Sequence, residues 1–315
     1  MRLYFLYFLP IVCIFLLLAG CGDDGEYQEV DFSQVTKVEE QKSSHTGEPR
    51  LRAAVGAMIS PQETFESYRK ILDYISRELD MDLEFVQRQT YSEVNELLGK
   101  GEIDLAFICS GPYVRGEEEH GFRLLASPQV DGSSRYYSYL IVHKDSPYQE
   151  LEDLRGKTFA FTDPDSNTGR MVPMSWVQEK GSTPEEFFQE IIYTYSHDNS
   201  ILAVSENLVD GAAVDHLIWE YFDRVDSEIT QDTRIIKKSQ PFGIPPIVVS
   251  PDLDAGKKKR LKEAVLEMHE DESGQEILSE LMIERFVPAQ DEWYDSIREI
   301  HKKLEESGFQ DAAQP

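Results

Sequence analysis

The stretch from Phe159 to Gly169 joins an apolar run to a cluster of small polar residues. The apolar run predicts a strand, and Pro164 then predicts a turn into a helix that begins near Ser166. Because a helix start exposes up to four unpaired N–H groups and about half a positive charge, it can hold a tetrahedral anion without a cation. The residues that could add donors or allow a close backbone approach are Ser166, Asn167, Thr168 and Gly169.

An ordinary helix cap is the alternative for this stretch. Either Asp165 or Ser166 could accept a hydrogen bond from the first turn and do nothing else. The run Ser166-Asn-Thr-Gly169 holds more residues that suit a ligand than a cap requires. We therefore predict an anion-binding turn at this helix start.

Strand and helix patterns alternate along the chain and predict an α/β protein. Leu51 to Met58 is a strand-like run, and Ser60-Pro-Gln-Glu63 then has the sequence of a capping box that starts a helix. Apolar residues follow at spacings of three and four as far as Leu79, which indicates one buried helix face. Further strands are predicted at residues 83–86, 103–108, 139–144, 157–162, 190–195 and 209–214, with helices that begin near Ser166, His197 and His216. This alternation predicts mostly parallel sheets with helices on both faces.

Two lobes joined by two crossings are expected, with a binding site in the crevice at the carboxyl ends of the strands. The chain returns through residues 234–239 and 243–250 and ends in helices near residues 255–270, 275–281 and 293–304. We predict four parts: a signal peptide at residues 1–20, a lipidated flexible tether at 21–50, a first lobe at 51–143 and 244–315, and a second lobe at 144–243.

The amino end predicts export and lipid anchoring. Arg2 precedes an apolar run from Leu3 to Leu18, which is shorter than the ~20 residues that a membrane span prefers. The run ends in Leu-Ala-Gly-Cys21, which resembles the lipobox of bacterial lipoproteins, in which the cysteine becomes the acylated first residue. An uncleaved anchor helix is the alternative. Both place the remaining chain outside the cytoplasm, held to a bacterial membrane, on the periplasmic side in a Gram-negative cell.

The composition restricts the partners. The net charge of −28 argues against nucleic acid and against an anionic membrane surface, because both need basic patches. An anion can still bind inside a cleft, since exposed charges are screened beyond roughly 8 Å at physiological ionic strength. Cys109 has no disulfide partner once Cys13 leaves with the signal and Cys21 is acylated. The sequence has no clustered cysteines and no His-Glu-x-x-His pattern, so we expect neither a metal nor another cofactor.

From about Leu51 to Phe286 the chain resembles the phosphate, phosphite and phosphonate substrate-binding proteins of ABC importers. The matching motifs are the aspartate-proline turn with its polar helix start and Pro173, the strand-ending turn Cys109-Ser-Gly-Pro-Tyr113, the helix-opening histidine in Tyr195-Ser-His-Asp198, and Ala203-Val204 with Val209-Asp-Gly-Ala-Ala-Val-Asp215. The resemblance implies the two-lobed type II periplasmic binding fold and a phosphoryl ligand between the lobes.

The resemblance also implies roles for particular residues. Ser166, Asn167, Thr168 and Gly169 would grip the phosphoryl oxygens, and the Tyr113 hydroxyl and His197 would donate further hydrogen bonds. His197 titrates near neutral pH and, when protonated, would favour a more highly charged ligand. We interpret Asp215 as a residue that orders or closes the cleft, because a carboxylate beside phosphate must share a proton or bind an amine. The alternatives are a core role for Tyr113 and a capping or surface role for His197.

Three positions depart from the family pattern. Asn167 stands where threonine is frequent, and Arg170 stands where an aromatic residue is usual. Arg170 is either a solvated surface residue or a partner for a second acidic group on the ligand. The stretch Gly243-Ile-Pro-Pro246 lacks the acid that aminophosphonate-binding members carry near the return crossing. We therefore expect phosphate, phosphite or a small alkylphosphonate to bind better than 2-aminoethylphosphonate.

The expected function is capture of a small phosphoryl oxyanion for the membrane permease of an ABC importer. A lipoprotein that presents the oxyanion to a membrane sensor is the alternative. An enzyme is not expected, although Ser166, His197 and Asp215 could be drawn as a nucleophile, a base and an orienting acid. Since no Gly-x-Ser-x-Gly elbow occurs, a phosphoester hydrolase is the weaker alternative.

Overall fold

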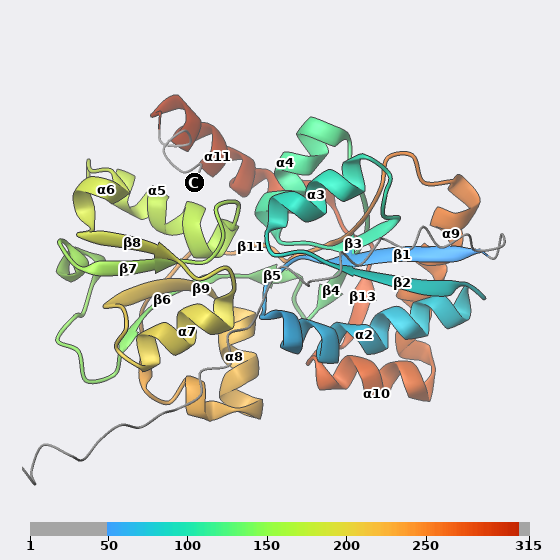
Figure 1. Ribbon diagram of the computed structural model, residues 1–315, viewed down its shortest axis with the longest axis horizontal. Helices are drawn as coiled ribbons and strands as arrows, with labels where there is room; N and C mark the ends of the chain where they lie inside the picture. Colours follow the sequence, from blue (N-terminus) through green and yellow to red (C-terminus); the bar gives the residue numbers. More distant parts are fainter. Residues whose placement is uncertain (1–48, 309–315) are drawn as a thin grey trace, which may run out of the picture. The chain divides into compact units, whose positions relative to one another are not determined.

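The predicted strands form two sheets (Figure 1). The computed structural model describes residues 49–308, apart from the side chains of residues 61–67, so the predicted signal peptide, the tether and Cys21 lie outside the described residues. The first sheet has the order β13-β4-β12-β3-β1-β2 and consists of β1 (Arg50–Val55), β2 (Asp82–Gln87), β3 (Leu105–Phe107), β4 (Arg123–Gln129), β12 (Ile247–Val249) and β13 (Arg285–Val287). The second has the order β10-β6-β9-β7-β8 and consists of β6 (Ser138–His143), β7 (Thr158–Phe161), β8 (Glu190–Tyr193), β9 (Gly211–Asp215) and β10 (Thr233–Lys238).

Most strands of each sheet run in one direction. In the second sheet β6 alone opposes the others, since it pairs antiparallel with both β9 and β10. In the first sheet β12 lies antiparallel between β3 and β4, and the edge strand β13 is antiparallel to β4. β6 and β12 are the strands that follow the two crossings. The mostly parallel two-lobed α/β fold predicted from the sequence is confirmed.

Helices cover both faces of each sheet. Those of the first part are α2 (Pro61–Glu78), α3 (Tyr91–Gly99) and α4 (Ser110–His120). The middle part holds η2 (Leu151–Leu154), η3 (Asn167–Met171), α5 (Val172–Gln178), α6 (Pro184–Phe187), α7 (His197–Ser205), α8 (His216–Val225) and η4 (Ser227–Ile229). The last part holds α9 (Ala255–Glu267), η5 (Met268–Glu270), α10 (Glu272–Glu280), η6 (Asp291–Tyr294) and α11 (Asp295–Glu306). Across residues 49–308, none of these helices has the length and apolarity that a membrane crossing needs.

Alternating side chains place the first sheet between two core clusters. In β1, Leu51 and Ala53 belong to the cluster that includes α2, α9 and α10, whereas Ala54 belongs to the cluster that includes α3 and α4. This follows from the period of two in a strand, whose successive side chains point to opposite faces. Figure 1 shows α2 and α10 on one side of this sheet and α3 and α4 on the other.

The helix starts agree with the sequence, with one difference in capping. Helices begin near Ser166, at His197 and at His216, as predicted. α2 begins at Pro61 as predicted, but the Ser60 side chain makes no capping hydrogen bond. Instead, the backbone N–H of Ser60 donates to the carboxylate of Asp198, at 3.0 Å to Oδ1 and 3.2 Å to Oδ2.

The chain changes sheet earlier than the predicted boundary at residue 143. β6 already belongs to the second sheet, so the first crossing lies at β5 (Arg135–Tyr136), which pairs with β11 (Phe242–Gly243) at the second crossing. The carboxyl-terminal segment is also not confined to the first lobe, because α11 packs against both α4 and α5. Apolar patterns predict strands well, but they do not specify the sheet that a strand joins.

Candidate functional site

The start of α4 lies against the turn that precedes η3. A Cβ atom at Gly111 would lie 2.4 Å from the carbonyl oxygen of Asp165 and 3.1 Å from the backbone nitrogen of Asn167. Only glycine therefore permits this approach. Arg115, one turn further along α4, donates to Asp165 Oδ1 at 2.8 Å. Two strand-to-helix turns, one from each sheet, thus meet.

The predicted anion-binding turn is a buried helix start. Ser166, Asn167 and Thr168 have no exposed surface, and Ser166 Oγ accepts a hydrogen bond from the Gly169 N–H at 3.0 Å. The helix cap that the sequence left open as an alternative is therefore present. It uses a lone pair of the hydroxyl and leaves the O–H hydrogen for another acceptor, so capping and ligand binding are compatible.

Several buried polar atoms on the elements that meet here have no hydrogen-bond partner among residues 49–308. They include Tyr91 Oη on α3, Asn167 Oδ1 and Thr168 Oγ1 on η3, and His197 Nε2 on α7. Buried polar groups are nearly always bonded, because an unpaired one costs about 1–3 kcal/mol. Unpaired donors at the starts of three helices are expected where a polar ligand binds.

Tyr91 and Tyr136 belong to one cluster with Cys109 and Asp215. Asn167 Nδ2 donates to Tyr136 Oη at 2.9 Å, and Cys109 Sγ lies 4.0 Å from the same oxygen. Burial raises the pKa of both phenols well above the ordinary value of 10, and the nearby Cys109 and Asp215 raise it further. Both tyrosines therefore stay protonated and keep an O–H to donate.

The His197 ring has a defined tautomer. The backbone N–H of Asp215 donates to His197 Nδ1 at 3.0 Å, so the proton of the neutral ring is on Nε2, the atom without a partner in the described structure. Burial lowers the pKa of His197, against the opposing effect of Asp215 and Asp198. His197 thus offers a neutral N–H, which differs from the protonated donor considered from the sequence. Because Nδ1 accepts a backbone N–H, it does not donate to the Asp215 carboxylate as a catalytic triad would require.

Asp215 ends β9 and starts α8. Its Oδ1 accepts a hydrogen bond from the Leu217 N–H at 2.8 Å, and the side chain of His216 lies 3.7 Å from the same oxygen. The carboxylate is buried and already caps a helix. Across the described residues, no group of three histidine, cysteine or acidic side chains is arranged to hold a metal ion.

Tyr113 lies apart from this cluster. Its hydroxyl donates to Asp291 Oδ1 at 2.6 Å, and its ring packs edge-on against Tyr294. The Tyr113 hydroxyl is therefore bonded to Asp291 and not to the cluster. Tyr91 and Tyr136 are the tyrosines of the cluster, and neither was predicted from the sequence. A signal for Tyr91 was available, since it opens the helix that follows the strand at residues 82–87.

Arg170 is not a solvated surface residue. Only 7% of it is exposed, and Nη1 donates to the carbonyl oxygen of Pro164 at 2.7 Å. Its Nε has no partner among the described residues. The guanidinium thus braces the loop before η3, which corrects the interpretation of Arg170 as a solvated side chain.

Backbone hydrogen bonds connect the elements of the two sheets around the cluster. The His197 N–H donates to the carbonyl oxygen of Met58 at 3.0 Å, and the Tyr91 N–H donates to Asp163 Oδ2 at 3.1 Å. Together with the Ser60–Asp198 contact, these bonds join the loop after β1 and the start of α3 to the turns after β7 and β8. The unpaired donors are consequently enclosed.

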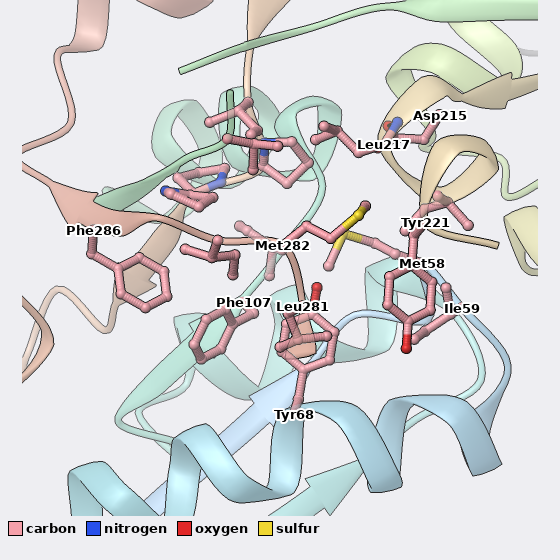
Figure 2. Close-up of a pocket in the computed structure, with 18 residues that line it drawn as sticks. Met58, Ile59, Tyr68, Phe107, Asp215, Leu217, Tyr221, Leu281, Met282 and Phe286 are labelled. Carbon is pink, nitrogen blue, oxygen red and sulfur yellow. Dashed lines mark hydrogen bonds between the residues drawn. The ribbon is translucent and has the colours of Figure 1, made fainter. Parts of the chain in front are cut away.

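An apolar pocket of about 80 Å³ adjoins the cluster at Asp215 (Figure 2). Its walls include Met58 after β1, Leu217 on α8, Met282 after α10 and Phe286 on β13. In Figure 2 the Asp215 side chain lies at one end, and Met282 lies between Phe107 and Tyr221. We call this space the apolar pocket.

Residues 54–294 match the sequence pattern of a family described as the phosphonate periplasmic substrate-binding proteins of ABC transporters. The chain is 32% identical over 136 residues to the phosphonates-binding periplasmic protein of Escherichia coli, a match that covers 42% of this chain and 40% of that protein. It is 22% identical to a probable ABC transporter phosphite binding protein of Prochlorococcus marinus, over 73% of this chain and 81% of that protein. The chain thus spans about two fifths of the E. coli relative.

Two solved structures share the fold. A binding protein component of an ABC phosphonate transporter from Pseudomonas aeruginosa aligns with a TM-score of 0.78 and 21% identity, over 85% of this chain and 91% of that one. A protein of Prochlorococcus marinus, solved in complex with methylphosphonate, aligns with a TM-score of 0.73 and 20% identity, over 81% of this chain and 98% of that one.

Proposed function

Because the chain belongs to the family of phosphonate periplasmic substrate-binding proteins of ABC transporters, we propose that it captures phosphate, phosphite or a small phosphonate between its two lobes for an importer's permease. The observation that carries this proposal is the set of buried, unpaired polar atoms on Tyr91, Thr168 and His197, which belong to three different helix starts. A phosphoryl group presents several acceptor oxygens in a tetrahedral arrangement. Donors supplied by three different helix starts suit such a group better than a planar carboxylate.

The ligand site would work through neutral donors. Tyr91, Thr168, Ser166 and His197 would each donate one hydrogen bond, and the N–H groups at the start of η3 would add their dipole. Asn167 would hold Tyr136 in place through the bond to its hydroxyl. Gly169 would serve the same turn, because a Cβ there would lie 1.8 Å from Thr162 Oγ1.

We also propose that the mature protein is a lipoprotein whose acylated residue is Cys21, which holds the binding unit at the outer side of a membrane. The basis is the sequence Leu-Ala-Gly-Cys21 at the end of an apolar run. We propose binding without turnover, because His197 is hydrogen-bonded as a neutral donor and lacks the acid partner that would make it a strong base.

Calorimetry with phosphate, phosphite and methylphosphonate tests the binding proposal. Removal of one hydrogen bond to a charged ligand costs about 1.5–3 kcal/mol, which corresponds to a loss of affinity from about tenfold to over a hundredfold. We expect losses of this size for Ser166→Ala and Thr168→Val.

Ser279→Ala is the matched control, because Ser279 is an exposed residue on α10 whose hydroxyl bonds only to its own helix. Its affinity should equal that of the unchanged protein. If no phosphoryl compound binds to the unchanged protein, or if both site variants bind as tightly as the control, the proposed function is wrong.

A further inference from the structure

The wall of the apolar pocket consists almost entirely of apolar side chains. Among the described residues that line it, Asp215 alone is charged. Its Oδ1 already accepts the Leu217 N–H, so this carboxylate has a structural role in the start of α8. The return crossing contributes Ile244, Pro245 and Pro246 to the wall, none of which has a side chain that could bind a cation.

The pocket adjoins the donor cluster, because residues of its wall are hydrogen-bonded to His197. Met58 lines the pocket, and its carbonyl oxygen accepts the His197 N–H at 3.0 Å. Asp215 lines the pocket, and its N–H donates to His197 Nδ1 at 3.0 Å. Ile108 lines it too and is followed directly by Cys109, which precedes α4. A ligand whose head group contacts His197 would therefore lie beside the apolar pocket.

Met282 is held in an unusual conformation at this wall. It follows α10 with φ of 56°, in the left-handed region, where a helix usually places glycine. Its side chain lines the pocket, and Arg224 Nη1 on α8 lies 3.2 Å from its sulfur. A flexible, polarisable side chain thus occupies a position where backbone conformation alone would favour glycine, which fits a wall that adapts to an apolar group.

We propose that the ligand is an alkylphosphonate whose hydrocarbon chain, of roughly two to four carbons, lies in the apolar pocket. The volume of about 80 Å³ is near half that of an engineered apolar cavity that holds benzene, which sets this length. This inference rests on the proposed function and narrows its substrate class. Inorganic phosphate would leave the pocket unused. An ammonium at the chain end would have Asp215 as its one charged partner in the wall, a carboxylate whose Oδ1 already accepts the Leu217 N–H, and would otherwise be buried against Ile244 and the prolines.

A ladder of methyl-, ethyl-, propyl-, butyl- and hexylphosphonate, measured by calorimetry, tests the proposal. We expect the affinity to rise about fourfold for each methylene that enters the pocket, equivalent to about 0.8 kcal/mol, and to stop rising near butyl. Propylphosphonate and 2-aminoethylphosphonate have the same number of heavy atoms, and the propyl compound should bind at least about tenfold more tightly.

Two variants should change, in opposite directions, the longest alkyl chain that still gains affinity. Leu217→Trp should fill the pocket and shorten the longest chain that still gains affinity, whereas Met282→Gly should lengthen it and is favoured by the local backbone. Leu208→Trp is the matched control, because Leu208 is 66% exposed and does not line the pocket. The control variant should bind each alkylphosphonate of the series with the affinity of the unchanged protein. Thermal melts establish that each variant is folded.

The possible outcomes separate this inference from the proposed function. If phosphate, methylphosphonate and propylphosphonate bind equally well, or if 2-aminoethylphosphonate binds more tightly than propylphosphonate, the apolar pocket does not hold an alkyl chain and the proposed function still stands. An unchanged length limit in folded Met282→Gly and Leu217→Trp would also overturn the inference. If no member of the ladder and no inorganic phosphate binds, the proposed function itself is wrong.

Discussion

The hydroxyls of Ser166 and Thr168 have different tasks in the ligand-free protein. Ser166 caps a helix, whereas Thr168 Oγ1 is buried without a described partner. Thr168→Val replaces an unpaired hydroxyl with a methyl group, so the free energy of unfolding should stay constant or rise by up to about 1 kcal/mol. Ser166→Ala removes a helix cap and should lower the free energy of unfolding by about 1 kcal/mol. Urea unfolding without ligand measures both, and a marked loss of stability in Thr168→Val would indicate that its hydroxyl is bonded in the protein.

Asp163 should make folding depend on pH. Its carboxylate accepts the N–H groups of Tyr91 and Asp165, yet burial raises its pKa from 3.8 to about 6. A raised pKa means that the folded state binds the proton more tightly, so this contribution to stability is present below about pH 4 and is lost as the pH rises to about 6. At 1.36 kcal/mol per pKa unit the change is about 3 kcal/mol.

Asp163→Asn should remove this component of the pH dependence. The measurement is the free energy of unfolding between pH 4 and pH 7 for both proteins, and the difference between them should change across that interval. A constant difference would show that Asp163 titrates normally in the folded state.

The helix start at Ser166 was predictable from the sequence because its polar residues are adjacent in the chain. Ser166, Asn167 and Thr168 occupy one helix start, and a local pattern suffices to find it. Tyr91 and Tyr136 reach the same cluster from the first lobe and from a crossing, and no local pattern specifies such a meeting. For Tyr113, a motif match could not specify where the hydroxyl points, which depends on Asp291 far along the chain.

Among the elements, the start of α4 determines how closely the turn after β3 approaches the turn before η3. Gly111→Ala would bring a carbon to 2.4 Å from the Asp165 carbonyl oxygen, so the turn must move away. We expect at least a tenfold loss of phosphoryl affinity, measured by calorimetry.

Gly256→Ala is the control for that change, because Gly256 is likewise the second residue of its helix, α9. Alanine in place of glycine in a helix gains about 0.5–1 kcal/mol. A Cβ at Gly256 would lie 3.0 Å from Asp254 Oδ1, which caps α9, and this close contact offsets part of that gain. The control variant should therefore differ little in stability and should bind normally. Equal affinities in the two variants would show that the approach of α4 to the turn does not shape the site.

The elements themselves were predictable because each depends on local periodicity. Strands with buried runs and helices with capped starts appear where expected, including those that begin at His197 and His216. The boundary at residue 143 was misplaced, because β6 pairs with β9 and β10, which come at least 68 residues later in the chain. Pairing across such distances depends on the whole fold.

For the whole molecule, lipid anchoring is a separate prediction. Cys21→Ser should release the protein from the membrane fraction into the soluble fraction, since the modified residue would be absent. Cys109→Ser is the control, because this cysteine is buried beside Tyr136 and should not affect fractionation. If the Cys21 variant stays in the membrane fraction and is released only by detergent, an uncleaved anchor helix is favoured over acylation.

The position of β12 between β3 and β4 has a consequence for the order in which the protein acquires its structure. An exported chain that emerges amino end first delivers β3 and β4 long before residues 247–249, so the first sheet cannot close until most of the chain has crossed the membrane. The second sheet needs only residues 138–238, which form one continuous segment. Since contacts between distant segments form slowly, amides in β7 and β9 should gain protection from hydrogen exchange earlier during refolding than those in β1 and β3. The second lobe would then serve as the template on which the first is completed.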